Sequence, residues 1–278
     1  MDLDLDKIGT YLEAHLPGFK ELRSAEKFSR GQSNPTYLLK AASGTYALRR
    51  KPDGVLLKSA HAVDREFRVQ KALANTNVPV PKMHLLCEDP NIAGTMFYVM
   101  EFVQGQNYMD PQLPTLNNPA RSHIYAQMNS CLANLHAVDL ADVGLNDYGP
   151  DGNYFERQIS RWSKQYKASE TQTISQMDEL MAELNARDAF DDGQRTLVHG
   201  DFRIDNLIFD ANTNDCLAIL DWELSTTGHP YADLASFLMQ LRMPLGEEGR
   251  GLHGLDRKSL GIPTENEFIE AYCQKRNI

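Results

Sequence analysis

The sequence predicts an α+β fold of two lobes: a small antiparallel-sheet lobe with one main helix at residues 1–103, and a larger, mainly helical lobe at residues 104–278. Extended runs separated by turn residues dominate the first hundred positions. A polar, proline-rich passage, QGQNYMDPQLPTLNNP, comes after residue 103 and is typical of a connection. Apolar stripes at helical spacing dominate the chain beyond it.

The small lobe is predicted from four extended runs and one helix. Runs at 36–40 and 45–50 are joined by the short turn AASG, which favours a hairpin. The stretch SAHAVDREFRVQKALANTN places Val63, Phe67 and Leu73 near one helical face. The segments VPVPKMHLLCED and TMFYVMEFV then indicate two more strands, and a hinge is expected near 101–105.

Three helices with apolar stripes are predicted in the large lobe, and we expect all three stripes to lie in its core. The stripes are Ile124, Met128, Leu132 and Leu135; Phe155, Ile159, Trp162 and Tyr166; and Ile174, Met177, Met181 and Leu184. The short apolar segments TLV, NLIFD and LAILDW follow and are read as small strands. PYADLASFLMQL is a further helix, with Pro230 near its first turn.

Composition excludes several classes of protein. The chain has 278 residues with a formal net charge of −10, which argues against a nucleic-acid partner. The four cysteines form no CxxC pair, so neither a zinc site nor a disulfide framework is expected. No apolar run is long enough to span a membrane, and the acidic start is unlike a signal peptide, so the expected location is cytoplasmic.

The passage LVHGDFRIDN, residues 197–206, gathers His199, Asp201, Arg203, Asp205 and Asn206 between two short apolar segments. Asp221 ends the next apolar run, and a hairpin could bring it beside Asn206. A carboxylate and an amide oxygen suit Mg²⁺, which takes the rest of its shell from water and phosphate oxygens. Asp201 would then be free to orient a hydroxyl during phosphoryl transfer, and Arg203 to neutralise the moving charge. Asp205 has no assigned role.

Three other interpretations remain open at this point. A two-metal phosphoesterase is disfavoured because the spacing of GDFRID is off by one and no bridging ligand set can be assembled. Asp201 and Asp221 could merely cap turns. A non-catalytic module could bind ATP through the same residues without turnover.

The motifs resemble those of the aminoglycoside phosphotransferase and choline kinase-like family, which has a protein-kinase-like fold. LVHGDFRIDNLIFD is similar to its H-G-D-x-x-x-x-N loop, and ILDWELSTTGHPYADLA is similar to its metal-binding segment. GQSNPTYLL, ALRRKP, HAVDREFRVQKAL and FYVMEFVQG also match the kinase-like domain associated with acyl-CoA dehydrogenases. The resemblance extends from about residue 25 to 275, and the chain after Asp233 is short for the family.

This resemblance implies an ATP- and Mg²⁺-dependent phosphotransferase. Asp201 would be the catalytic base, with Arg203 near the γ-phosphate and Asn206 and Asp221 holding the metal. Glu66 would pair with the cation on the third strand. The remaining implied roles are adenine binding by Met100, Glu101 and Val103, and support of the catalytic loop by Asp233 and His199.

Two positions depart from the family pattern. The strand cation is Arg49 in place of the usual lysine; it keeps a fixed charge but adds a planar fork. The phosphate loop, SRGQSNPTY, has one glycine, and Gln32, Ser33 and Asn34 are expected to supply donors to the phosphates, with a plain turn as the alternative.

The acceptor is expected to be a small molecule, because the segment between Asp221 and Asp233 is too short for a peptide-binding activation loop. The resemblance favours a hydroxyacyl-type compound, with an aminoglycoside or another amino alcohol as the alternative. Basic residues for a CoA group would be Arg157, Arg161, Lys164 and Lys167, unless they form a solvated face. A monomer or a homodimer is expected.

Overall fold

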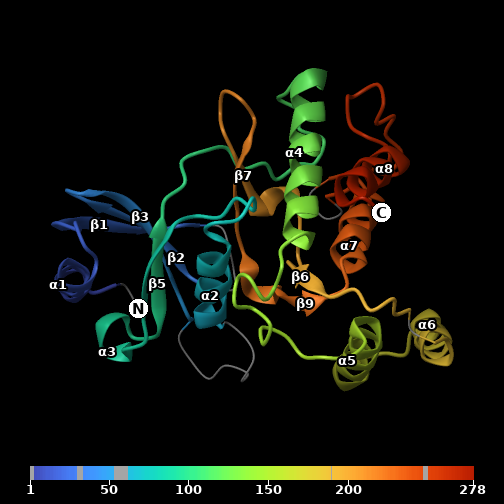
Figure 1. The fold of residues 1–278 in the computed structure, drawn as a ribbon, viewed down its shortest axis with the longest axis horizontal. Coiled ribbons are helices and arrows are strands. Elements are labelled where there is room, and N and C mark those ends of the chain that lie inside the picture. Colours follow the sequence, from blue (N-terminus) through green and yellow to red (C-terminus); the bar gives the residue numbers. More distant parts are fainter. Residues whose placement is uncertain (1–2, 30–33, 53–61, 189, 247–249) are drawn as a thin grey trace.

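The small lobe is built on an antiparallel sheet. The computed structural model describes residues 3–29, 34–52, 62–188, 190–246 and 250–278. Within these ranges the sheet has five strands in the order β1-β2-β3-β5-β4 (Figure 1). The strands are β1 (Leu22–Lys27), β2 (Thr36–Ala41), β3 (Gly44–Arg50), β4 (Met83–Cys87) and β5 (Phe97–Glu101). The two predicted hairpin runs and the two later strands are confirmed, whereas β1 was not predicted.

Helix α1 (Leu5–His15) covers the sheet on one side, and the short α3 (Pro90–Ala93) lies beside it. The Asp4 side chain caps α1 by accepting the Lys7 N–H at 3.1 Å. The apolar faces of helix and sheet form one buried cluster, because strand side chains alternate and put every second residue on the helix side. The cluster includes Ile8, Leu12, Leu39, Leu48, Phe97 and Val99.

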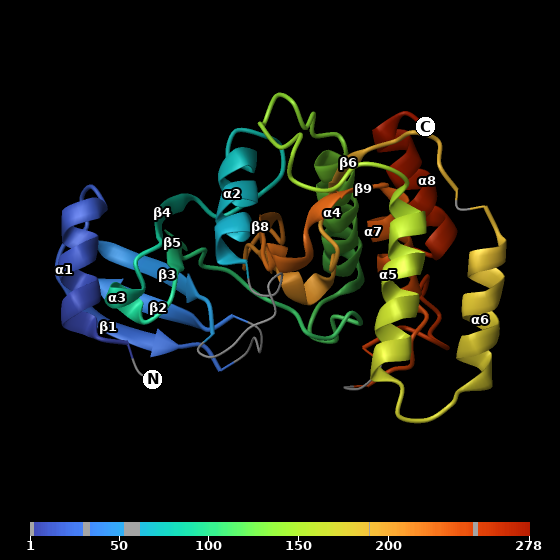
Figure 2. The same ribbon diagram turned by 90° about the horizontal axis from the view of Figure 1, so that it is seen from below.

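Helix α2 (Val63–Leu73) contributes to both lobes. Val63 packs with the sheet residues Tyr98 and Met100, while Val69 and Leu73 belong to the core of the large lobe. Arg65 reinforces the second contact: it donates to the Tyr148 carbonyl at 2.7 Å and stacks over the Tyr148 ring. The small-lobe helix is therefore fixed against the large lobe (Figure 2).

The large lobe is organised around α4 (Asn118–His136). Its predicted stripe is confirmed, since Ile124, Met128, Leu132 and Leu135 are fully buried. Helices α7 (Tyr231–Leu241) and α8 (Glu265–Arg276) complete this core. Pro230 is the N-cap of α7, as predicted. The Thr264 and Glu267 side chains form a capping box that begins α8.

The prediction for the second and third stripes is wrong. Helices α5 (Tyr154–Ser169) and α6 (Ser175–Ala186) contain no buried residue, and Trp162 is 55% exposed. The two helices pack on each other at the periphery (Figure 2). Helical periodicity identifies which face of a helix is apolar. It does not show how much of that face is covered, and a helix that packs against only one other helix stays partly exposed to solvent.

Short strands carry the polar passage. Strand β6 (Thr196–Val198) pairs with β9 (Thr226–Gly228), and β7 (Leu207–Phe209) pairs with β8 (Cys216–Ile219). The 3-10 turns η1 (Ile204–Asn206) and η2 (Trp222–Leu224) lie between them. Strands β6, β7 and β8 correspond to the predicted apolar segments. In the described ranges, no helix is both long and apolar enough to cross a membrane.

Candidate active site

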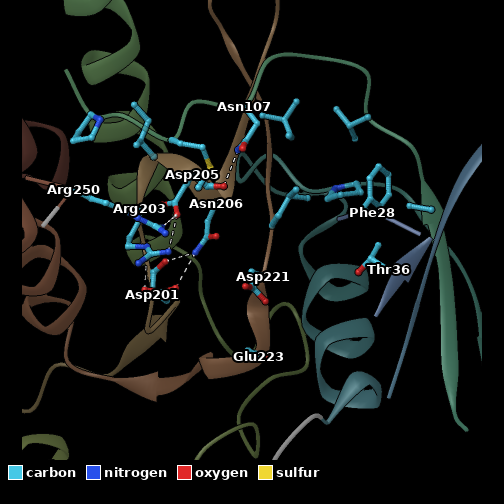
Figure 3. A pocket seen from close by; sticks show the side chains of 18 of the residues that line it. Phe28, Thr36, Asn107, Asp201, Arg203, Asp205, Asn206, Asp221, Glu223 and Arg250 are labelled. Atoms are coloured by element: carbon cyan, nitrogen blue, oxygen red, sulfur yellow. Dashed lines mark hydrogen bonds and ion pairs between the residues drawn. The ribbon is translucent and has the colours of Figure 1, made fainter. Parts of the chain in front are cut away.

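A cavity of about 1530 Å³ lies between the lobes, and both of them line it (Figure 3). The residues that line it come from distant parts of the chain, from Phe28 to Gly251. The predicted site residues on this wall are Arg49, Met100, Glu101, Val103, Asp201, Arg203, Asn206 and Asp221.

The turn at His199 and Gly200 places Asp201 on the cavity wall. Gly200 has a φ of +85°, and a Cβ there would lie 2.6 Å from the Leu224 carbonyl oxygen, so only glycine fits. The Asp201 N–H donates to His199 Nδ1 at 3.2 Å, and His199 Nε2 lies 2.9 Å from the Leu220 carbonyl oxygen. With Nδ1 accepting and Nε2–H donating, the buried His199 ring is bonded on both sides and shapes the loop.

The buried Asp233 holds the same turn through its backbone N–H groups. Its carboxylate accepts the His199 N–H at 2.7 Å and the Gly200 N–H at 2.8 Å, and it lies 3.3 Å from His136 Nε2. Burial alone would raise the pKa of Asp233, but these hydrogen bonds and the nearby His136 lower it below its usual value. The predicted contact of Asp233 with the catalytic loop is confirmed.

Asn206 is tied to Asp201 by its amide group. Nδ2 donates to the Asp201 carbonyl oxygen at 2.8 Å and to Oδ2 of the carboxylate at 3.0 Å. Because Nδ2 makes both of these hydrogen bonds, the amide oxygen of Asn206, Oδ1, points away from Asp201 and is available to another partner. Asp201 keeps its second carboxylate oxygen beside Arg203, with Oδ1 3.5 Å from Nε.

The hairpin β7–β8 brings Asp221 to Asn206, which confirms that prediction. Leu207 pairs with Ile219, and the Leu220 N–H donates to the Asn206 carbonyl at 2.8 Å. Asp221 then has a φ of +62°, a left-handed conformation that directs the chain away from the strand. Figure 3 shows the Asp221 carboxylate and the Asn206 amide directed toward the same space.

Arg49 joins the two lobes. Its Nε lies 2.8 Å from Glu66 Oε2, the predicted ion pair, and its Nη2 lies 2.6 Å from Asp221 Oδ1. Burial opposes the charge of Arg49, yet Glu66 and its other anionic neighbours raise its pKa above the ordinary value. The link to Asp221 was not predicted, and it requires the forked guanidinium that distinguishes this residue from lysine.

Glu66 is buried in a polar network with Asn34 and Tyr98. The Asn34 amide donates to Glu66 Oε1 at 2.6 Å and the Tyr98 hydroxyl to Oε2 at 3.0 Å. Burial raises the pKa of Glu66, and Arg49 counteracts this rise. Asn34 therefore supports Glu66 here, and its predicted contact with phosphate stays a prediction. Gln32 and Ser33 lie outside the described residues.

The hinge passes along one edge of the cavity. Met100 and Glu101 end β5, and the chain then crosses to the large lobe, where Gln106 forms two backbone hydrogen bonds with Phe209. A Cβ at Gly105 would lie 2.5 Å from the Phe209 carbonyl oxygen, so the crossing needs glycine. In the described chain the Val103 amide has no hydrogen-bond partner, which leaves it available to a ligand.

Asp205, which had no predicted role, is held by two arginines. Its Oδ2 lies 2.7 Å from Arg203 Nη2 and 3.1 Å from Arg250 Nη1. The Asn107 amide binds the Asp205 carbonyl oxygen at 2.7 Å and thereby fixes the backbone. Arg250 is 45 positions away, so no local pattern could have identified it.

The donor set fits a magnesium ion. Asn206 Oδ1 and the Asp221 oxygen not bonded to Arg49 are hard oxygen ligands at one place on the wall. In the part of the chain that the structure describes, three or more His, Cys, Asp or Glu side chains nowhere gather as a metal cluster. Two protein oxygens with phosphate and water oxygens are the composition that Mg²⁺ prefers.

Arg157, Arg161, Lys164 and Lys167 lie on α5 and do not line the cavity. Arg157 donates to the Asp151 carbonyl, and Lys167 pairs with Asp178 and Glu170. The structure favours the alternative of a solvated face.

Known proteins resemble the chain over nearly its whole length. The family model described as the phosphotransferase enzyme family matches residues 24–260. Mouse acyl-CoA dehydrogenase family member 10 is 45% identical over 284 residues, and rat acyl-CoA dehydrogenase family member 11 is 43% identical over 281 residues. These alignments cover 100% and 99% of this chain but 26% and 36% of the relatives, so the chain spans about a third or less of their length.

Solved structures share the fold. A Ralstonia eutropha protein provisionally described as an aminoglycoside phosphotransferase has a TM-score of 0.90 and 44% identity; the match covers 99% of this chain and 81% of that one. The streptomycin–ATP ternary complex of APH(2")-IIa has a TM-score of 0.62 at 17% identity, covering 100% and 83%. The predicted two-lobed, protein-kinase-like fold is confirmed.

Proposed function

Because the chain belongs to the phosphotransferase enzyme family, we propose that it transfers the γ-phosphate of ATP to a hydroxyl group of a small molecule. We further propose that the preferred acceptor is a hydroxylated acyl compound. The observation that carries the first proposal is that Asp201, Asn206, Asp221 and Arg49 line one cavity, with Arg49 held by the buried Glu66. A turn-capping role would not require these side chains to converge.

Asp201 orients the acceptor and receives its proton. The acceptor oxygen attacks the γ-phosphorus, the bond from that phosphorus to the β,γ-bridging oxygen breaks, and ADP leaves. Asn206 holds the Asp201 carboxylate through Oδ2, which leaves Oδ1 for the acceptor hydroxyl. Arg203, 3.5 Å from Asp201, is placed to neutralise charge on the transferred group.

Arg49 and the hinge bind the nucleotide. Glu66 positions Arg49 toward the α- and β-phosphates, and the free Val103 amide and Glu101 carbonyl bind adenine beside Met100. Asn206 and Asp221 would hold Mg²⁺, which when bound neutralises the phosphate oxygens.

The acyl acceptor is supported by the cavity lining on the large-lobe side. Met109, Pro111, Tyr125, Phe237 and Leu241 give this side an apolar character that suits a hydrocarbon chain. A cationic aminoglycoside would be bound by acidic side chains, whereas this part of the cavity has the basic Arg203 and Arg250. The acyl-CoA dehydrogenase names of the relatives fit the same choice.

A panel of hydroxyl compounds, incubated with ATP and Mg²⁺, tests the proposal through ADP release. It should include hydroxylated fatty acids, their CoA thioesters, aminoglycosides and amino alcohols. Acceptor-dependent ADP release with an acyl member is expected. Tight ATP binding without ADP release on any member would identify a non-catalytic nucleotide-binding module instead.

Asp201→Asn tests the assigned role of the base. We expect kcat to fall by about 10²- to 10⁴-fold, the usual contribution of a general base, with ATP affinity nearly unchanged. Asp142→Asn, a change at an exposed carboxylate outside the cavity, is the matched control. A collapse of ATP affinity in Asp201→Asn would make Asp201 a metal ligand and contradict the assigned roles.

A further inference from the structure

Two guanidinium groups converge on a single carboxylate oxygen in the cavity. Oδ2 of Asp205 contacts both Arg203 Nη2 and Arg250 Nη1. The side chain of Asp205 is 9% exposed, whereas those of Arg203 and Arg250 are 32% and 47% exposed. The carboxylate is therefore covered and the two cations face the cavity, where Asp201, with Oδ1 3.5 Å from Arg203 Nε, is the second acidic neighbour of the pair.

Among the described residues, Arg203 and Arg250 use only part of their donors. A guanidinium has five N–H donors, and only one nitrogen of each bonds to Asp205. Arg203 Nε lies 3.5 Å from Asp201 Oδ1 in an ion pair, but it forms no hydrogen bond within the described residues. A buried donor without a hydrogen bond costs free energy, so an acceptor atom that reaches it is stabilised at this place. Such paired guanidinium groups suit carboxylate or phosphate oxygens.

The arginine pair lies on the acceptor side of the cavity. Figure 3 shows Arg203 and Arg250 around Asp205 at one side of the pocket, with Phe28 and Thr36 of the small lobe at the other. Arg49 supplies positive charge on the nucleotide side. The cavity lining also includes the acidic Asp110, whose carboxylate accepts the Gln112 N–H at 2.8 Å and keeps its charge.

We infer that Arg250, aligned with Arg203 by Asp205, binds an anionic group of the acceptor, while Arg203 between Asp201 and Asp205 can contact both that group and the transferred phosphoryl group. The acceptor class would be a hydroxylated compound that carries a carboxylate or a phosphate ester within reach of the hydroxyl. Asp205 is then a positioning residue, and Arg250 determines specificity. This inference rests on the proposed transfer to a hydroxyl and excludes cationic amino alcohols as preferred acceptors.

Matched acceptor pairs test the class. 3-Hydroxydecanoate is compared with its methyl ester, and glycerol 3-phosphate with glycerol, by ADP release at saturating ATP. We expect the anionic member of at least one pair to have the higher kcat/KM, by about 10- to 100-fold for one charged hydrogen-bonded contact. Carboxylate and phosphate ester are distinguished by which pair shows the preference.

Arg250→Gln should reduce that preference to within a few-fold, chiefly through the KM of the anionic acceptor, while leaving the KM of ATP unchanged. Arg250→Lys should retain part of it, because the charge stays and the fork is lost. Arg242→Gln is the matched control, since Arg242 is exposed and pairs with Glu265 outside the cavity. Thermal stabilisation of the unmodified chain by each acceptor measures binding without turnover.

Three outcomes would overturn the inference. Equal use and equal binding of both members of each pair would show no anion subsite. An equal loss of kcat on charged and neutral acceptors in Arg250→Gln would place Arg250 on the transferred phosphoryl group. A raised KM for ATP would place it on the nucleotide. Absence of transfer to every compound is separate, because it refutes the proposed function itself.

Discussion

Replacing Asp233 by asparagine removes the charge that supports the catalytic turn while keeping the size of the side chain. The carboxylate accepts two backbone N–H groups, from His199 at 2.7 Å and Gly200 at 2.8 Å. An amide presents an oxygen to only one of them and sets its own NH₂ group against the other. The variant therefore loses one hydrogen bond and leaves a buried donor unsatisfied.

The expected cost follows from these contacts. A hydrogen bond to a charged group contributes about 1.5–3 kcal/mol, and an unsatisfied buried donor costs about 1–3 kcal/mol. Asp233→Asn should therefore lower the free energy of unfolding by about 2.5–6 kcal/mol. Because the turn carries Asp201, the folded fraction should also show a reduced kcat.

Urea unfolding followed by circular dichroism measures this loss. Asp139→Asn is the control, because Asp139 also accepts two backbone N–H groups, from Ala141 and Asp142, but lies at the surface. We expect the control to cost less than about 1 kcal/mol, since both N–H groups bond to Oδ1, an oxygen that asparagine keeps, and the site is open to water. A loss below about 1 kcal/mol in Asp233→Asn would refute the idea that this carboxylate holds the turn.

Further predictions concern the lobe contact, the loop and the effect of pH. Arg49→Lys keeps the charge but cannot reach both Glu66 and Asp221, so ATP affinity measured by calorimetry should fall about tenfold; unchanged affinity would contradict the role of the fork. Gly200→Ala should cost at least about 1–3 kcal/mol of stability, because its φ is positive and its Cβ would meet the Leu224 carbonyl; the melting temperature reports it. Burial lowers the pKa of His136 below 6.5, although Asp233 opposes the shift. The unfolded state therefore binds a proton that the folded state does not, so stability should be lost as pH falls from about 6.5 toward the folded pKa, and His136→Gln should weaken this dependence in urea titrations.

Local contacts explain which parts of the site could be predicted from the sequence. Asp201 and Asn206 are five positions apart, so one turn brings them together, and the Asn206 amide bonds to Asp201 directly. The hairpin that brings Asp221 to Asn206 joins neighbouring short strands. The buried face of α4 could also be predicted, because the helical period of its apolar residues defines the face that packs in the core of a central helix.

The features that the sequence did not predict have one physical cause: each depends on contacts with residues that are distant in the chain. The stripes of α5 and α6 showed an apolar face but not how much structure would cover it, and these helices lie at the periphery. Asp205 looked unassigned because Arg250 belongs to a distant loop. The contact of Asn34 with the buried Glu66 was not predicted either, because nothing in the segment around Asn34 indicates it.

The sequence by itself determined the local arrangement of the 197–206 turn: its motif spacing places a carboxylate, an amide and an arginine together, because their geometry depends on a few backbone dihedral angles. The tertiary structure alone decided how the lobes are connected and which side chains line the cavity. Arg49 and Asp221 are 172 positions apart, and their 2.6 Å contact exists only because the sheet and the β7–β8 hairpin pack across one cavity. Burial and long-range pairing depend on the whole fold, so no local pattern encodes them.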